Sequence, residues 1–293
     1  ENTRLNATQI ASDFQIFKTI LEEGHPNLYE YTSKEKWNRL YNDFKNRIPS
    51  IKNSSDLFKE LHAITDHAKD GHLMLFPKPS NEEPIFFPLL LKIINDNFYV
   101  DTDDFDIPIG SKVISINKRK ASYLLKSMLK YVPSDGYGLN KKYREIELKF
   151  SVFYFYEYGR PESYNITYQK PDGTVVETTI NGEHFNKIKI RNASKQSYAS
   201  KYHGFDNPLD YFKERINPQK PFVYFIDSTS TAVVTVNTFK YEIKEFKSTL
   251  TEIFKKIKKE KSKNLIIDIR NNIGGFRPNT IFLFNYITNK RYK

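Results

Sequence analysis

The sequence predicts an α+β protein of several domains, and three observations lead to that expectation. Near the amino terminus, apolar residues recur at the spacing of helices with one buried face. In the middle of the chain, short runs of β-branched and aromatic residues alternate with turn residues, as in strands. The last third follows the pattern strand, helix, strand, helix, which is typical of a β-α-β unit with a parallel sheet.

The composition is that of a folded chain with a sizeable core. Of its 293 residues 39% are hydrophobic, with 20 Tyr and 23 Phe, which distinguishes the chain from a disordered segment. No apolar run approaches the roughly 18 residues that a membrane span needs, so we expect no membrane span. The sequence begins at Glu1 without a leader peptide, which fits a processed or a trimmed chain and is compatible with a lipid anchor upstream of Glu1.

Cysteine content and charge narrow the chemistry. Cysteine is absent, which excludes thiol nucleophiles, zinc thiolate sites and disulfides. The formal net charge is +11, but the lysines are interleaved with acidic residues. The densest basic run, residues 255–263, carries Ile257 on a helical pattern and fits a solvated helix face better than a nucleic-acid patch. We therefore expect no nucleic-acid partner and no cofactor.

Residues 1–76 are expected to form a helical domain. Each of three stretches carries a single apolar face at helical spacing. These apolar faces run from Ile10 to Leu21, from Trp37 to Ile48, and from Leu57 to Ile64. Ser33 is a suitable cap for the second helix.

Three histidines follow at intervals of five residues, at His62, His67 and His72. Five residues turn a helix by about 500°, so these side chains point in different directions, whereas helical metal sites use i, i+4 pairs. We therefore expect no metal site. His72 follows Asp70 and Gly71 at the start of a predicted strand, residues 72–76, where it is either a candidate general base or an ordinary structural histidine.

Residues 82–182 are expected to form a β-rich domain after a proline-rich linker. Turns at residues 95–96 and 171–173 predict two hairpins. The strand at 109–117 and the helix after it resemble the peptide-binding PDZ module, in which a peptide adds a strand to a sheet edge. A plain β-rich packing domain fits the pattern equally well.

Residues 183–293 are expected to form the first part of an incomplete α/β core, after a connecting loop over 183–220. Its regular elements are two strands, an amphipathic helix, a buried strand and a further helix, at 222–227, 231–236, 242–261, 265–269 and 278–288. A sheet of this kind needs more strands, so we expect the core to continue beyond Lys293.

The turn at Gly274 and Gly275 is the strongest candidate for chemistry. It follows the strand at 265–269, and sites in parallel sheets lie at the carboxyl ends of strands. Two glycines allow a sharp turn, and Pro278 is favoured at the start of a helix. Backbone N–H groups at the start of a helix suit an anion or an oxyanion.

These residues resemble the carboxyl-terminal processing, or tail-specific, serine peptidases, the family that includes the tricorn core. Leu265–Gly275 is the most specific part of the resemblance, and Thr235–Phe239 precedes it. Asp70–His72 is similar to a short motif of the family, Ile109–Asn117 to the carboxylate-binding strand of its PDZ-like domain, and His25–Tyr29 to a connector of bacterial members.

The resemblance implies a serine endopeptidase with a PDZ-like domain and a truncated, crotonase-like α/β core. Gly274 and Gly275 would supply oxyanion-hole N–H groups, and His72 would be the general base. The nucleophilic serine of the family lies beyond Lys293, so this chain alone is expected to be inactive. The resemblance further implies a peptide or protein substrate and an exported protein, periplasmic or at the bacterial cell surface. It leaves the oligomeric state open.

A non-catalytic protein on the same fold, binding a peptide or an apolar ligand, is the alternative. The aromatic stretch at 150–156 motivates it, because it could line an apolar groove. The peptidase hypothesis makes a geometric prediction instead: His72 should face the Gly274–Gly275 turn across one open cleft.

Overall fold

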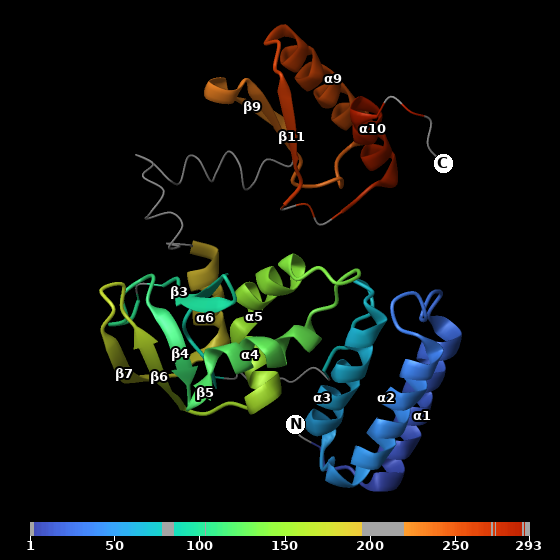
Figure 1. The fold of residues 1–293 in the computed structure, drawn as a ribbon, viewed down its shortest axis with the longest axis vertical. Coiled ribbons are helices and arrows are strands. Elements are labelled where there is room, and N and C mark those ends of the chain that lie inside the picture. The colour runs from blue at the N-terminus through green and yellow to red at the C-terminus, as the bar shows by residue number, and fades with distance from the viewer. Residues whose placement is uncertain are drawn as a thin grey trace. The chain divides into compact units, whose positions relative to one another are not determined.

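The chain folds as two compact units, Glu1–Tyr198 and Ala199–Lys293, in the computed structural model of Figure 1. The structure describes residues 3–77, 85–102, 104–194, 220–270, 272, 274–288 and 290. The position of one unit relative to the other is not determined, so each is described by itself. The division into three domains at 1–76, 82–182 and 183–293 stays a prediction.

The first unit begins with helices packed side by side (Figure 1), as the apolar spacing predicts. They are α1 (Ala7–Gly24), α2 (Lys34–Arg47), the 3-10 turn η1 (Ile48–Ser50), α3 (Ser54–Thr65) and the 3-10 turn η2 (Asp66–Ala68). Ser33 caps α2 by accepting a hydrogen bond from Lys36 N–H. Trp37 is fully buried and donates its indole N–H to Leu28 O at 3.1 Å. The indole N–H of this buried ring is therefore satisfied inside the apolar helical core.

An antiparallel sheet forms the second part of this unit. Its strands are β2 (Leu91–Ile94), β3 (Asn97–Val100), β4 (Lys112–Ile116), β5 (Arg119–Lys120), β6 (Ser163–Gln169) and β7 (Val175–Asn181), in the order β2-β3-β4-β6-β7 with β5 paired to β4. A separate antiparallel pair consists of β1 (Ile85–Phe86) and β8 (Glu183–His184). Both predicted hairpins are confirmed, because β2 pairs with β3 and β6 pairs with β7.

Helices cover the sheet and supply much of its core. They are α4 (Ala121–Met128), the 3-10 turn η3 (Leu129–Tyr131), α5 (Asn140–Tyr158) and α6 (Phe185–Ser194). The aromatic stretch at 150–156 lies in α5, where Phe150, Phe153 and Tyr154 are buried in the core of the sheet. These three rings therefore form packing rather than the wall of a groove.

Two expectations for the first unit are wrong. Residues 72–76 form no strand: Leu73 and Leu75 pack against the helical core while Met74 and Phe76 are exposed, but this extended segment has no partner strand among the described residues. Residues 183–194 are not a connecting loop, because they form β8 and α6. Whether residues 72–76 and 183–184 form strands depends on pairing with distant residues, which local sequence does not reveal.

The second unit is a three-stranded sheet with two helices. Its elements are β9 (Phe222–Ile226), the 3-10 turn η4 (Asp227–Thr229), β10 (Thr231–Thr235), α9 (Ile243–Lys259), β11 (Asn264–Asp268) and α10 (Arg277–Ile287). The order is β11-β10-β9, with β10 and β11 parallel and β9 antiparallel to β10. The predicted β-α-β crossover is thus confirmed.

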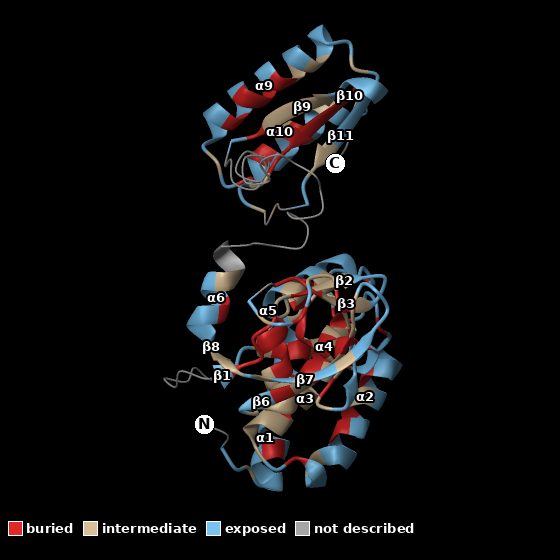
Figure 2. Ribbon diagram, turned by 90° about the vertical axis from the view of Figure 1, so that its left-hand side faces the viewer, coloured by how far each residue is buried: buried red, intermediate tan, exposed pale blue. Residues whose placement is uncertain are grey.

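Burial differs sharply between the strands of this unit. Every residue of β10 is buried, and Figure 2 shows this central strand in red. The expectation that β11 is buried is wrong for this chain: Leu265 and Ile266 are 40% and 49% exposed. The physical reason is its position, because β11 is the outer strand of the sheet and pairs on one side with β10.

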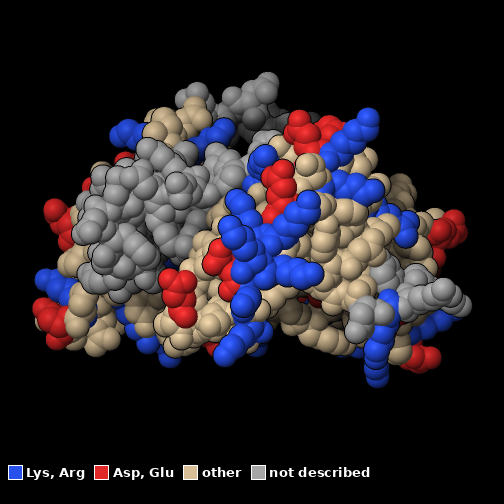
Figure 3. Space-filling view, turned by 90° about the horizontal axis from the view of Figure 1, so that it is seen from above, with Lys and Arg blue, Asp and Glu red and all other residues tan. Residues whose placement is uncertain are grey.

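Helix α9 has the amphipathic character that its sequence predicts. Phe246, Leu250 and Ile253 pack in one core cluster with Leu283 of α10. The lysines of the basic run are exposed, whereas Ile257 packs against that cluster. On the face drawn in Figure 3, Lys and Arg side chains lie among Asp and Glu. The basic run is therefore a solvated helix face, and the absence of a nucleic-acid partner stays a prediction.

None of the helices within the described residues is both long and apolar enough to cross a bilayer.

Candidate functional site

The loop that carries the candidate base is held at several backbone atoms. Lys69 enters the left-handed region with φ 53°, and its carbonyl oxygen accepts a hydrogen bond from Gly136 N–H at 2.9 Å. Gly71 N–H donates to Asp135 Oδ1 at 2.7 Å, and Gly71 O accepts from Lys141 Nζ at 3.2 Å. The segment before α5 thereby fixes the loop that leaves η2.

Gly71 leaves the space that the Asp135 carboxylate occupies. A Cβ atom built at this position would lie 2.9 Å from both carboxylate oxygens of Asp135. Such a contact is closer than carbon and oxygen tolerate, so a larger residue would push Asp135 away from the loop. The glycine in the motif Asp70–His72 therefore has a packing reason.

Asp70 lies between two histidines. Its Oδ1 accepts the backbone N–H of His72 at 2.6 Å and lies 3.7 Å from Nδ1 of the same residue. Its Oδ2 lies 3.0 Å from Nε2 of His25. The backbone hydrogen bond from His72, helped by the adjacent His25, lowers the pKa of the Asp70 carboxyl. Asp70 is therefore an anion beside the His72 imidazole at neutral pH.

His72 itself reaches into solvent. Its side chain is 93% exposed, whereas the loop that carries it is fixed. An accessible imidazole next to a carboxylate is the arrangement of a general base that can approach a substrate. The sequence motif indicated His72 and its neighbour Asp70, but not His25 and Asp135, which come from distant segments.

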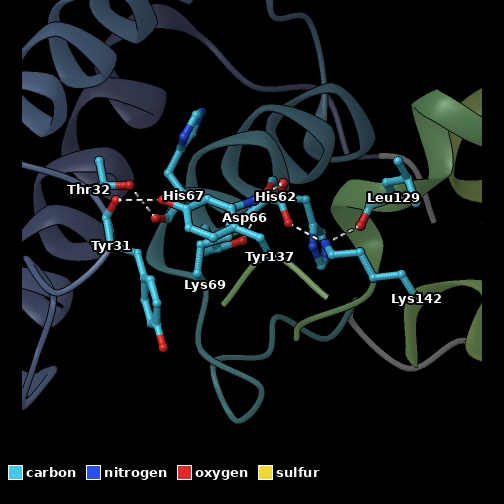
Figure 4. Close-up of polar contacts among 10 residues, drawn as sticks. Tyr31, Thr32, His62, Asp66, His67, Lys69, Leu129, Tyr137 and Lys142 are labelled. Atoms are coloured by element: carbon cyan, nitrogen blue, oxygen red, sulfur yellow. Dashed lines mark hydrogen bonds and ion pairs between the residues drawn. The ribbon is translucent and has the colours of Figure 1, made fainter. Parts of the chain in front are cut away.

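The other two histidines of the series lie elsewhere. His62 is buried in α3, and burial lowers its pKa to about 4. Figure 4 shows His62 and His67 pointing to different sides, as the helical geometry predicts. The polar contacts near these two histidines join parts of the fold to one another. Lys142 Nζ forms an ion pair with Asp66 and donates to Leu129 O at 2.8 Å.

Within the part of the chain that the structure describes, one set of side chains has the spacing of a metal site. Asp70, His72 and Asp135 place one potential ligand atom each within 4.8 Å of the others. Two carboxylates and an imidazole could hold a divalent cation. Each carboxylate, however, already accepts a backbone N–H of the loop, from His72 and from Gly71. The expectation of no metal stays a prediction.

The glycine turn follows β11 in the second unit. Gly274 and Gly275 have φ values of 100° and 143°. Phe239 N–H donates to Gly274 O at 2.9 Å, and Phe276 N–H donates to Phe239 O at 3.0 Å, so the turn runs parallel to the segment after β10. A Cβ atom at Gly275 would lie 2.1 Å from Lys240 N. The close approach of two backbones therefore requires glycine at 275.

Asparagine side chains position the turn, and sequence reasoning missed both. Asn272 Oδ1 accepts Gly274 N–H at 2.7 Å, while its Nδ2 donates to Val236 O at 2.9 Å. Asn279, buried at the start of α10, donates to Phe239 O at 3.0 Å. The bond from Gly274 N–H to the side chain of Asn272 two residues earlier is the pattern of an Asx turn, for which asparagine is the usual residue.

The two glycine N–H groups differ in availability. Gly274 N–H is used by Asn272, whereas Gly275 N–H donates to no other residue that the structure describes. Gly275 N–H is therefore the donor open to a ligand at the start of α10. The oxyanion role of both residues stays a prediction.

His72 lies in the first unit and the glycine turn in the second. Because the two units are not placed relative to each other, the expectation that they face one cleft stays a prediction.

The segment with the glycine turn matches a known protein family, and the chain as a whole is similar to solved structures. Residues 230–293 match the family model of Peptidase family S41. Mature CPAF is 12% identical with a TM-score of 0.51, over 92% of this chain and 56% of that one. Mature CPAF complexed with lactacystin is 12% identical with a TM-score of 0.52, over 96% and 59%.

A mutant of CPAF is also 12% identical, with a TM-score of 0.52 over 92% of this chain and 57% of that one. At this identity the likeness concerns the fold, a mixed α+β architecture with a helical amino terminus. The chain spans less than two thirds of the length of these structures. No curated protein matches this chain.

Proposed function

Because residues 230–293 belong to peptidase family S41, as the sequence resemblance predicted, we propose that the chain is the amino-terminal part of a serine endopeptidase. The observation that carries the proposal is the glycine turn after β11, with an available N–H at Gly275 inside the matched segment. Its substrates are peptide bonds of exported proteins or peptides, in the periplasm or at the bacterial cell surface.

Each candidate residue has a defined step in this chemistry. A serine hydroxyl attacks the peptide carbonyl, and His72 takes the proton of that hydroxyl and then gives it to the leaving amine. The carbonyl oxygen becomes an oxyanion, which accepts hydrogen bonds from Gly275 N–H and, after release from Asn272, from Gly274 N–H. One such donor lowers the barrier by about 3 to 4 kcal/mol.

The serine itself is not assigned to any residue of this chain. Serines 228 and 230 precede the glycine turn, opposite to the order of the family. The exposed apolar residues of β11 and α10, namely Leu265, Ile266, Ile281 and Phe284, support a core that is completed by further sheet and helix. The chain alone is therefore inactive in this proposal.

Substrate recognition is assigned to the sheet of the first unit. A PDZ-like domain there would bind the end of an extended peptide as an added strand. The antiparallel order of β2 to β7 with α4 packed against β3 and β4 supports this role. The alternative, a non-catalytic binding protein, is based on an apolar groove lined by the aromatic stretch at 150–156. Because Phe150 and Phe153 are buried in the core, this stretch does not favour that alternative.

The test uses the longer protein that continues past Lys293. It should hydrolyse peptides and be labelled by a serine-directed fluorophosphonate, whereas residues 1–293 alone should do neither. H72A should lower kcat at least about 1,000-fold, and H184A, at an exposed histidine outside the site, should not. A longer protein without labelling, or with full activity in H72A, contradicts the proposal.

A further inference from the structure

We propose that His25 is a positioning residue for His72 and acts through Asp70, so that His25, Asp70 and His72 form one relay. This inference rests on the proposed function, because it concerns the residue assigned as base. It adds an acidic partner, Asp70, and a buried histidine that orients that partner. The role of His25 does not follow from sequence proximity, because His25 lies at the end of α1.

His25 is held rigidly at the carboxyl end of α1. Its side chain is 8% exposed, and its backbone N–H donates to Leu21 O at 3.2 Å. Nδ1 accepts the backbone N–H of Asn27 at 3.2 Å. A ring nitrogen that accepts a hydrogen bond carries no proton, so the neutral ring has its proton on Nε2.

The acceptor nearest to the Nε2 proton of His25 is the carboxylate of Asp70. Nε2 is buried and lies 3.0 Å from Asp70 Oδ2, but it forms no hydrogen bond of good geometry with any described residue. A buried N–H without an acceptor is costly, so a small rotation that completes the hydrogen bond to Asp70 is favoured. His25 Nε2–H is therefore directed to one oxygen of the carboxylate.

The other oxygen of Asp70 is thereby directed to His72. Oδ1 accepts the backbone N–H of His72 and lies 3.7 Å from its Nδ1. An ionised carboxylate beside Nδ1 favours the tautomer with the proton on that nitrogen, which leaves the lone pair of Nε2 free to accept a proton. The same charge stabilises the imidazolium that forms during the reaction.

Neighbouring charges do not offer an equivalent partner. Asp135 lies in the same cluster and, like Asp70, accepts a backbone N–H, but among the described residues the imidazoles of His25 and His72 pair with Asp70 and not with Asp135. Lys141 Nζ is directed to Gly71 O. Asp70 is therefore the carboxylate in this loop whose orientation a second imidazole fixes.

The experiment measures the tautomer of His72 in residues 1–293 by long-range ¹H–¹⁵N NMR at alkaline pH, where imidazoles are neutral. The chain has six histidines, and H72Q identifies the signals of His72. The wild type should have the Nδ1–H form enriched over that of free histidine. D70N should shift the ratio up to about fivefold toward Nε2–H, as expected for the loss of an exposed charge contact worth up to about 1 kcal/mol.

Substitutions at His25 separate positioning from mere packing. H25Q places an amide N–H near the position of Nε2 and should retain the wild-type ratio, whereas the shorter H25N should shift it toward the D70N value. Fluorescence of the buried Trp37 reports whether each variant folds. If H25N misfolds, the comparison of H25Q with D70N still decides the role of Asp70.

Either of two tautomer results, or one kinetic result, overturns the proposal. An unchanged ratio in D70N excludes Asp70 as the acidic partner, and an unchanged ratio in folded H25N excludes His25 as its holder. In the longer protein, H25N should lower kcat roughly tenfold at constant KM, with recovery in H25Q. Wild-type kcat in H25N refutes the relay but leaves the peptidase function intact, whereas an inactive longer protein refutes the function without touching the tautomer result.

Discussion

The sharpest structural prediction concerns the two glycines of the turn, which differ in their surroundings. At Gly274 a Cβ atom would meet no atom of the described residues within 4 Å, whereas at Gly275 it would lie 2.1 Å from Lys240 N and 2.3 Å from the carbonyl carbon of Phe239. Both glycines have a positive φ. Both G274A and G275A should therefore lose stability through backbone strain, but only G275A should also lose stability through a steric clash with the neighbouring backbone.

The shared cost is backbone strain, about 1 to 3 kcal/mol for an alanine at such a φ. G275A must also separate the turn from the segment at Phe239. That separation breaks the hydrogen bonds from Phe239 N–H to Gly274 O and from Phe276 N–H to Phe239 O, at about 1 kcal/mol each. G275A should thus be about 2 kcal/mol less stable than G274A.

Hydrogen exchange of the second unit, measured by mass spectrometry, provides the assay. An additional 2 kcal/mol corresponds to about 30-fold faster exchange in the peptides that contain Phe239 and Phe276. Fluorescence of Trp37, which lies in the first unit, should keep its urea midpoint in both variants. Equal exchange in G274A and G275A would refute the reasoning from close backbone approach.

Three further predictions concern the first unit. As the pH falls from 6.5 to about 4, the unfolded state takes up a proton before buried His62 does, so stability should drop by up to about 3 kcal/mol, and H62L should flatten this slope in urea unfolding. K142M leaves Asp66 with a single cationic partner, Lys69, and should cost about 2 to 3 kcal/mol in urea unfolding; a cost equal to that of a surface lysine contradicts it. Zn²⁺ or EDTA should leave Tm unchanged, and a rise with Zn²⁺ that D135N abolishes would mean that this cluster binds metal.

Local signals predicted most of the regular elements. Three apolar stripes at helical spacing became α1, α2 and α3, and the alternating segments around Asn95 and Asp96 became a hairpin whose turn residues both have positive φ. The crossover from β10 through α9 to β11 followed from its periodicity. Such elements depend on residues close in sequence, which is why the sequence is sufficient for them.

The failures have a common physical origin in long-range pairing. Residues 72–76 alternate in burial as a strand does, yet no described strand pairs with them. The two-residue strands β1 and β8 pair across about 100 residues, which no local pattern reveals. The burial of β11 depends on neighbours on both sides of the strand, so an apolar run identified the strand but not its exposure.

The candidate site likewise contains residues that a local motif reveals and residues that only folding brings close. Asp70 and His72 are two residues apart, and one motif contains both. His25 and Asp135 approach the same loop from 45 residues before Asp70 and 65 residues after it. Sequence indicated that a base could lie here, but only the folded chain brings its neighbours together.

The glycine turn finally requires a distinction between two reasons for the same residue type. Gly275 must be glycine because the backbone at Phe239 and Lys240 lies against it, and this requirement would hold in a protein without any catalytic activity. The motif alone is therefore weak support for an oxyanion site. The stronger support is that Gly275 N–H points to no described acceptor while Gly274 N–H has one in Asn272. A donor left open beside a backbone so closely packed is rigid before any ligand arrives, and rigidity of this kind makes a donor effective toward a developing charge.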